Sequence, residues 1–318
     1  MKSFDYKFKI PVLKSDLHFE DRLFAFFIKS LGFAFIALFF LMAIIIFVKA
    51  WPALSHFGLS FFVNPNWDSW KQDFGVLSLI YGTLVSSLLA LLLSVPLSIA
   101  FALFLTELAP KWLSKILGFI VEMLASIPSI IYGMWGVFVL APFLREHVQP
   151  FLSRYFGEVF LFSGDFYGIG MMCAGIILAI MITPTISSIC KEVFHSIPLS
   201  HKEAVLSLGT TRWEMFKVAI LKGGLSGIVG AIVLGFGRAF GETMAVTMVI
   251  GNKPVIDFSI FAPSQTMASI LATQYAEAGT ELHLSSLTAV GFTLFIVSLF
   301  FNSVSMFFVW RMKKSFKR

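Results

Sequence analysis

Charged side chains are scarce in this 318-residue sequence. Asp, Glu, Lys and Arg make up 13% of the residues, whereas 58% are hydrophobic. A soluble domain carries about 25% charged residues, so the composition excludes an ordinary soluble domain and indicates an integral membrane protein. Cysteine is scarcer still, with only Cys173 and Cys190. Two cysteines in one apolar run provide neither a disulfide framework nor metal-ligand spacing, and we interpret them as small apolar residues.

Nucleotide-binding and catalytic signatures are also missing. The sequence has no G-x4-G-K-[ST] phosphate loop, G-x-S-x-G elbow, H-E-x-x-H pair or paired-cysteine zinc motif. We therefore expect no cofactor, no metal and no enzymatic activity, and any ATP hydrolysis must belong to another polypeptide. The formal net charge of +6 comes from short basic stretches between apolar runs. That distribution indicates membrane topology rather than nucleic-acid binding.

Long apolar runs dominate the sequence instead. A bilayer-spanning helix needs about 20 apolar residues, and six stretches reach that length. We predict an all-α, polytopic membrane protein with six transmembrane helices at 23–48, 76–106, 114–140, 168–190, 223–250 and 285–310. If both termini are cytoplasmic, 17 Lys and Arg residues fall on the cytoplasmic side and 5 on the outer side. The positive-inside rule favours that orientation.

These spans divide the chain into three parts. Residues 1–22 form a cytoplasmic N-terminal segment, residues 23–310 form the transmembrane domain, and residues 311–318 form a basic cytoplasmic tail. The longest cytoplasmic loop, residues 191–222, separates the fourth span from the fifth. We expect the protein to be a multi-pass protein of the bilayer.

The 191–222 loop has the sequence features of two short helices. Pro198 ends the preceding helix, and Ser200 is a suitable N-cap for a new one. Gly209 allows a sharp turn between the two helices. A surface helix that lies on the membrane is one interpretation of this amphipathic loop.

The order Glu203-Ala204-x4-Gly209 supports a second interpretation. It resembles the EAA loop of ABC importer permeases, E-A-A-x3-G-x9-I-x-L-P, although three positions of that pattern hold other residues here. In that family the loop forms a coupling helix that docks on a cytoplasmic ATPase. The resemblance assigns Glu203, Ala204 and Gly209, within residues 201–215, to ATPase coupling.

The stretch GRAFGETMAV, residues 237–246, places two charges deep in the fifth predicted span. Arg238 lies fifteen residues from the start of that span, roughly 22 Å along a helix. A charge at that depth costs on the order of 2.5–3.5 kcal/mol. Arg238 and Glu242 are spaced i, i+4, so on one helix they share a face and can pair. One interpretation is a salt bridge that fixes packing, and the other is a translocation pathway.

Four stretches together resemble the PstC-like permease subunits of phosphate-specific ABC importers. They are ASIPSIIYGMWGVFVLAP (125–142), GRAFGETMAVTMVIGN (237–252), FAPSQTMASILA (261–272) and LHLSSLTAVGFTLF (282–295). The resemblance runs from about residue 74 to the C-terminus. It implies a type I ABC importer permease fold, a bacterial inner-membrane location and phosphate as the substrate. It also implies a second, PstA-like permease subunit, two PstB-like P-loop ATPase subunits and a PstS-like phosphate-binding protein.

The resemblance favours the pathway interpretation of the charged stretch. A guanidinium donates two parallel hydrogen bonds to an oxyanion, which suits phosphate. Glycine spaced at i, i+4 allows close approach of a helix or a ligand. The predicted substrate pathway comprises Arg238, Glu242, Thr243, Gly237 and Gly241. Glu242 is expected to pair with Arg238 when no anion is bound.

Three alternatives differ in their expected behaviour. A permease for sulfate, molybdate or phosphonate would share the loop but transport another oxyanion. An ion-coupled secondary transporter would use Arg238 and Glu242 as a proton-coupled pair and would work without an ATPase. A membrane-embedded enzyme would need catalytic groups clustered at one membrane face, and the sequence offers no such cluster.

Overall fold

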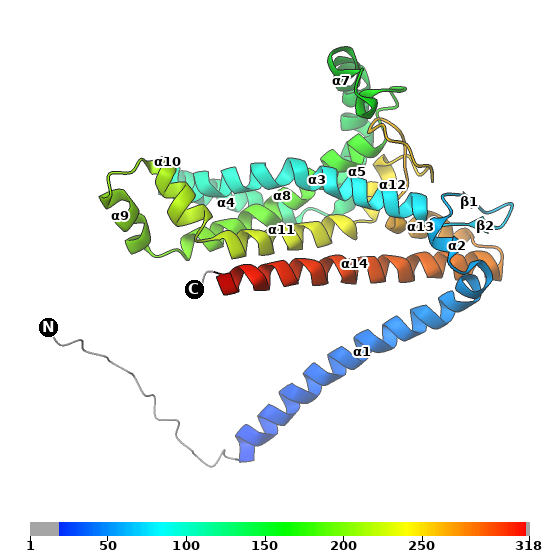
Figure 1. The fold of residues 1–318 in the computed structure, drawn as a ribbon, viewed down its shortest axis with the longest axis horizontal. Helices are drawn as coiled ribbons and strands as arrows, with labels where there is room; N and C mark the ends of the chain where they lie inside the picture. Colours follow the sequence, from blue (N-terminus) through cyan, green and yellow to red (C-terminus); the bar gives the residue numbers. More distant parts are fainter. Residues whose placement is uncertain (1–18, 316–318) are drawn as a thin grey trace. The chain divides into compact units, whose positions relative to one another are not determined.

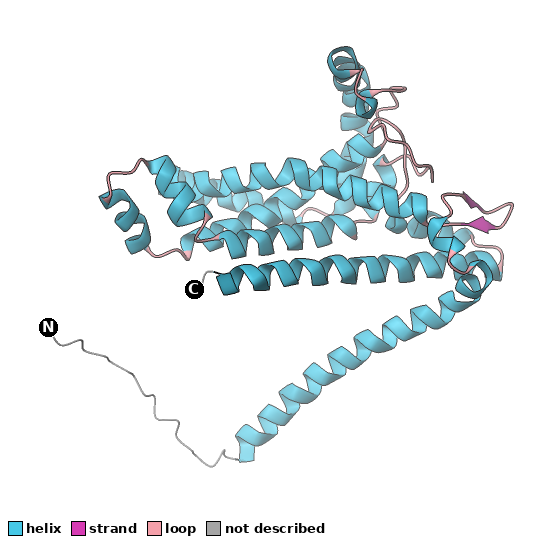
Figure 2. Cartoon of the chain, in the orientation of Figure 1, coloured by secondary structure: helices cyan, strands magenta, loops and turns pink. Residues whose placement is uncertain are grey.

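The structure is a computed structural model that describes residues 19–315, and it is almost entirely helical (Figure 2). Most of the predicted N-terminal segment, residues 1–18, and the end of the predicted basic tail, residues 316–318, lie outside the described residues. The chain divides into two units, residues 1–48 and residues 49–318.

The described part of the first unit is a single helix. Helix α1 (Phe19–Phe57) begins there and continues into the second unit. The side chains of residues 21–42 are all exposed within the chain. A helix that is apolar on every side belongs in lipid or against other helices. It is long and apolar enough to cross a bilayer, as predicted for residues 23–48.

The second unit contains the remaining elements. Its helices and strands are α2 (Ser60–Val63), β1 (Trp67–Asp68), β2 (Asp73–Phe74), α3 (Leu77–Leu103), α4 (Lys111–Ser126), α5 (Ser129–Trp135), α6 (Ala141–Phe143), α7 (Gln149–Phe156), α8 (Met171–His195), α9 (Leu199–Ser207), α10 (Arg212–Met215), α11 (Leu225–Phe240), α12 (Met244–Val249), α13 (Met267–Gln274) and α14 (Glu281–Ser315). The strands β1 and β2 pair antiparallel, with Trp67 opposite Phe74.

Turns of other helical types extend several of these helices. π-Helical turns lie at Phe104–Leu108, Gly136–Leu140, Leu144–Val148 and Phe216–Leu221, and short 3₁₀ turns lie at Phe160–Phe162 and Tyr275–Glu277. The turn Phe104–Leu108 continues α3 directly, and the turn Phe216–Leu221 continues α10. π-Turns inside helices are rare and recur at functional sites.

Four helices are individually long and apolar enough to span a membrane: α1, α3 with its π-turn, α8 and α14. Two bent pairs raise the number to six if each pair is one span. Helix α4 and the segment Ser129–Phe156 meet at 91°, and Arg212–Leu221 meets Leu225–Phe240 at 70°. The predicted span 114–140 is therefore bent, and the predicted span 223–250 is interrupted at residues 241–243, which are not helical. The 91° bend falls at Pro128, which favours a kink because proline lacks an N–H.

Helix α8 is the centre of the second unit. It packs most extensively against α3 and next against α11, while α14 lies along α11 (Figure 1). The helices α9 and α10 lie at one end of these long helices, and the β1–β2 hairpin and α13 lie at the opposite end (Figure 1). Helix α8 continues on both sides of Pro184.

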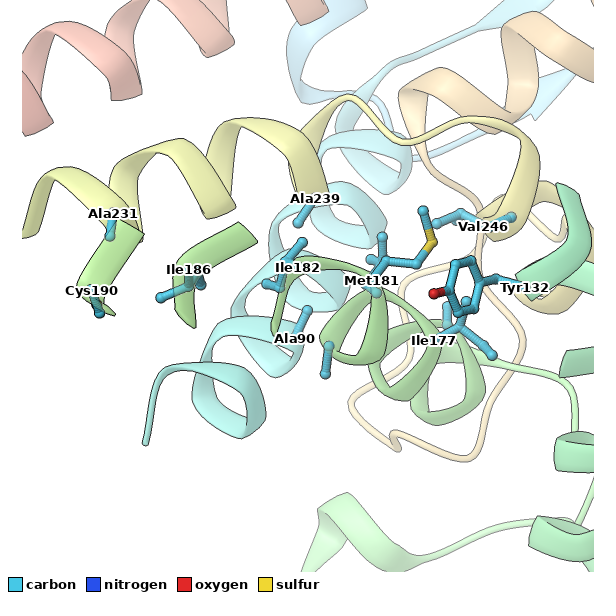
Figure 3. Close-up of a cluster of buried hydrophobic side chains, with 14 of the residues drawn as sticks. Ala90, Tyr132, Ile177, Met181, Ile182, Ile186, Cys190, Ala231, Ala239 and Val246 are labelled. Carbon is cyan, nitrogen blue, oxygen red and sulfur yellow. The ribbon is translucent and has the colours of Figure 1, made fainter. Parts of the chain in front are cut away.

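The main core is built from α8 and small residues of its neighbours. Ile177, Met181 and Ile182 of α8 are buried beside Ala90 of α3 and Ala239 of α11 (Figure 3). Small side chains let helix backbones approach closely without the gaps that larger side chains would need.

Two glycines of α11 allow the same approach to α8. A Cβ on Gly227 would lie 2.4 Å from a methyl carbon of Val193, and one on Gly235 would lie 2.6 Å from Ile186. Both cysteines of α8, Cys173 and Cys190, are buried free thiols, consistent with their interpretation as small apolar residues.

Candidate functional site: a broken helix around Arg238

The charged stretch does not form one continuous helix. Helix α11 ends at Phe240, residues 241–243 are not helical, and α12 starts at Met244. Arg238 therefore lies in the last turn of α11, while Glu242 lies in the break. The argument that both side chains share a helix face at i, i+4 is wrong, because it needs unbroken helix between them.

Arg238 reaches across to the central helix. Its Nη1 donates a hydrogen bond of 3.0 Å to Oγ1 of Thr185 on α8. The guanidinium is half-buried and lies close enough to Tyr132 of α5 to interact with it electrostatically. A guanidinium has five N–H donors, and only one of those on Arg238 has a partner among residues 19–315. The remaining donors suit an oxyanion.

The expected pairing of Arg238 with Glu242 is not formed. The ion pairs in the described part of the chain join Lys71 to Asp68, Arg145 to Glu146 and Lys202 to Glu107. None of them includes Arg238 or Glu242, so a salt bridge does not explain the arginine.

Glu242 instead contacts the start of the next helix. Its Oε1 accepts a weak hydrogen bond of 3.4 Å from the backbone N–H of Ala245 in the first turn of α12. A negative charge is favourable at a helix N-terminus. Thr243 donates from its hydroxyl to the carbonyl oxygen of Gly241, at 3.3 Å. Both side chains thus stabilise the break locally.

Tight packing against α5 holds α12 in place beyond the break. A Cβ on Gly133 of α5 would lie 2.8 Å from Sδ of Met248 and 3.0 Å from Cα of Ala245. At the other end of α12, Nδ2 of Asn252 donates a hydrogen bond of 2.7 Å to the carbonyl oxygen of Thr247. Asn252 thus caps that end of α12.

Gly237 and Gly241 are not needed for packing within this chain. A Cβ on Gly237 would meet nothing closer than Oδ1 of Asn302 at 3.8 Å, and one on Gly241 nothing closer than a backbone oxygen at 3.6 Å. The backbone around Arg238 is therefore accessible to another group. At Gly227 and Gly235, by contrast, side chains of α8 occupy the space that a Cβ would need.

Contacts at Thr183, the residue before Pro184, fasten α8 to α3. Oγ1 of Thr183 lies 3.1 Å from Oγ of Ser94, within hydrogen-bond distance, and Oγ of Ser98 donates to the carbonyl oxygen of Thr183 at 3.2 Å. These contacts fix the segment that carries Thr185, and with it the partner of Arg238. Sequence reasoning missed Thr185; the available signal was the T-P-T stretch at 183–185.

The predicted coupling loop consists of two short helices, as expected. Helix α9 is followed by Gly209 in a left-handed conformation (φ +76°) and then by α10. Thr211 and Glu214 form a capping box at the start of α10. The prediction of Ser200 as an N-cap is wrong, because α9 starts directly after Pro198 and Ser200 lies inside it. Proline is tolerated at a helix start, where its missing N–H has no helical partner.

The loop presents an exposed surface and one buried connection. Glu203 and Ala204 are exposed, and the nearby Leu208 and Trp213 are 81% and 58% exposed. By contrast, Nζ of Lys202 on α9 lies 2.5 Å from Oε1 of Glu107 in the π-turn after α3. The side chains of that ion pair are only 15% and 12% exposed. The loop is thus attached to the end of α3 and leaves apolar groups free for a partner.

Metal ligation finds no support among residues 19–315. They include no group of three or more His, Cys, Asp or Glu side chains that could hold an ion. Glu122 of α4 is exposed and forms no ion pair in the described residues.

Solved structures share this fold. One chain of a bacterial ABC transporter that imports the acidic polysaccharide alginate matches with a TM-score of 0.60 and 19% identity, covering 91% of this chain and 96% of that chain. A chain of the MetNI methionine ABC transporter matches with a TM-score of 0.52 and 20% identity, covering 75% and 94%. The fold is therefore that of an ABC importer permease, a multi-pass membrane protein, as predicted.

Sequence comparison narrows this class. The family described as binding-protein-dependent transport system inner membrane component matches residues 94–314. The phosphate transport system permease protein PstC of Pasteurella multocida is 43% identical over 286 residues, covering 89% of each chain. The PstC of Mesorhizobium japonicum is 45% identical and covers 85% of this chain and 84% of its own length. A probable PstC of Methanocaldococcus jannaschii is 36% identical, covering 88% and 91%.

The chain belongs to the PstC family of transport-system permeases, within the binding-protein-dependent inner membrane components.

Proposed function

We propose that this chain is the permease subunit of an ATP-driven phosphate importer and forms part of the phosphate pathway at the break between α11 and α12. The observation that carries the proposal is the guanidinium of Arg238. It lies at the end of a membrane helix, has no carboxylate partner in the described chain and uses one donor on Thr185. The substrate named for the PstC relatives is phosphate.

The arrangement suits passage of an anion rather than permanent binding. Phosphate oxygens accept hydrogen bonds from the free N–H groups of Arg238, and Gly237 and Gly241 leave room for them to approach. The carboxylate of Glu242 lies in the break, on the α12 side, and adds a formal negative charge beside the path. That charge limits the affinity for an anion, so phosphate leaves again.

Coupling to ATP hydrolysis is proposed to occur through α9 and α10. Glu203, Ala204, Leu208 and Trp213 offer an exposed surface for one of two PstB-like ATPase subunits. A PstA-like permease subunit completes the pathway, and a PstS-like protein delivers phosphate from outside. This chain contributes no catalysis. Both termini are proposed to face the cytoplasm of a bacterial cell, with the chain in its inner membrane.

Substrate competition in proteoliposomes tests this function. The purified chain is reconstituted with its permease partner, ATPase and binding protein, and ATP-dependent uptake of labelled phosphate is measured. A hundredfold excess of unlabelled phosphate should block uptake, whereas the same excess of sulfate, molybdate or a phosphonate should not. An uncoupler that collapses the proton gradient should have no effect.

Two results would contradict the proposal in different ways. Equal competition by sulfate would indicate a permease for another oxyanion. Uptake that persists without ATP and disappears with the uncoupler would indicate a secondary transporter.

A further inference from the structure

An apolar groove runs along α8 on the side facing α4. It has a volume of about 520 Å³ and is lined by α3, α4 and α8. Its lining includes Leu97, Ile120, Ile180 and Pro184, and the only polar residues in it are Thr183 and Ser187. Both hydroxyls already donate to backbone carbonyl oxygens of α8. The groove therefore leaves no polar donor without an acceptor and suits a hydrocarbon.

The length of the groove matches one leaflet of a bilayer. Along α8 the lining extends from Ile176 to Ser187, which is about 16 Å of helix. One leaflet contributes about 15 Å of hydrocarbon. An acyl chain that lies along α8 would therefore extend from one end of the groove to the other.

A half-buried lysine, Lys191, lies at one end of the groove. Lys191 is one helical turn beyond Ser187, on the same face of α8 and toward α9. Its Nζ lies against α4, where a Cβ on Gly118 would be 3.1 Å away. Lys191 is half-buried and takes part in no ion pair in the described residues.

The charges around Lys191 are mixed but leave it available. Lys115 of α4 lies one turn from Gly118 and is exposed, which adds a second positive charge. Glu122, four residues beyond Gly118, and Glu192, next to Lys191, are both exposed, and neither forms an ion pair with the lysine. Basic pockets between membrane helices recognise the phosphate of anionic lipids.

We propose that this groove binds an anionic phospholipid, with one acyl chain between α3, α4 and α8 and the phosphate on Lys191. The lipid belongs to the leaflet on the α9 side. It fills a space next to Pro184 and the Thr183–Ser94 contact, so it supports the segment of α8 that carries Thr185. The site does not depend on which substrate the permease transports.

Native mass spectrometry of the purified full-length chain tests the site. Retention of phosphatidylglycerol is compared with that of phosphatidylcholine with the same acyl chains. Wild type should prefer phosphatidylglycerol, and Lys191→Gln should lower that preference about fivefold, since a basic residue near anionic lipid adds such a factor. Lys222→Gln, an exposed lysine outside the groove, should behave as wild type. Ile180→Trp fills the groove from α8 and should lower retention of both lipids. If Ile180→Trp folds poorly, Leu97→Trp, which fills the groove from α3, takes its place in the experiment.

Three outcomes would overturn the lipid site. The first is an unchanged lipid preference in Lys191→Gln. The second is displacement of phosphatidylglycerol by millimolar inorganic phosphate, which would make the lysine a site for free phosphate. The third is crosslinking of a photoreactive residue at position 180 to another protein chain rather than to lipid in native membranes.

Discussion

Replacement of Arg238 by glutamine is expected to reduce ATP-dependent phosphate uptake by about a hundredfold or more. Glutamine keeps the carbon stem of the side chain, but its amide is two bonds too short to reach Thr185 as the guanidinium does. The substitution also removes the positive charge and the two parallel N–H donors of the guanidinium. Two hydrogen bonds to a charged group together contribute about 3 kcal/mol. Uptake is measured in proteoliposomes that contain equal amounts of assembled complex.

Two further variants separate charge from geometry. Arg238→Lys keeps the positive charge but lacks the two parallel donors of the guanidinium. Its uptake rate should therefore lie between those of wild type and Arg238→Gln. Arg145→Gln removes an exposed arginine of the Leu144–Val148 turn and should leave uptake unchanged. Wild-type uptake by Arg238→Gln would show that the arginine does not handle phosphate.

Breaking the ion pair between Lys202 and Glu107 is expected to uncouple ATP hydrolysis from transport. The pair is nearly buried and joins α9 to the end of α3. Removal of one partner leaves the other as an unpaired buried charge, at a cost of about 3–5 kcal/mol. In Glu107→Gln the attachment of α9 is therefore lost. Phosphate uptake per ATP hydrolysed should fall about tenfold or more.

A charge exchange distinguishes this role from a general loss of stability. The double variant Glu107→Lys with Lys202→Glu restores opposite charges and should recover much of the coupling. Lys217→Gln removes an exposed lysine that lies over the Trp213 ring, in the same loop, and should retain the coupling ratio. A double variant no better coupled than the single variants would contradict a connecting role for the pair.

The sequence predicted the apolar helices and the two short helices of the 191–222 loop because their signals are local. Long apolar runs identify membrane helices whatever packs beside them, and the structure contains helices at all six predicted places. The turn at Gly209 and the kink at Pro128 follow from the backbone chemistry of those two residues. Both appear in the structure.

The sequence did not predict the surroundings of Arg238. The i, i+4 spacing implied a salt bridge, but the break at residues 241–243 separates the two charges. Neither Gly241 nor Glu242 forbids helix, so only the tertiary packing of α12 on α5 reveals the break. The partner of the arginine, Thr185, lies 53 residues away in sequence. No local pattern links two residues on different helices.

Thiol labelling at position 243 tests most directly whether the break lines an anion path. Thr243→Cys places one new thiol in the break, while the native Cys173 and Cys190 stay buried. Leu234→Cys, on an exposed apolar face of α11, is the matched control and should not react in lipid. A membrane-impermeant anionic thiol reagent should label Thr243→Cys in the assembled transporter, and phosphate, but not sulfate, should slow that labelling. No labelling, or labelling that phosphate does not slow, would contradict a phosphate pathway at this break.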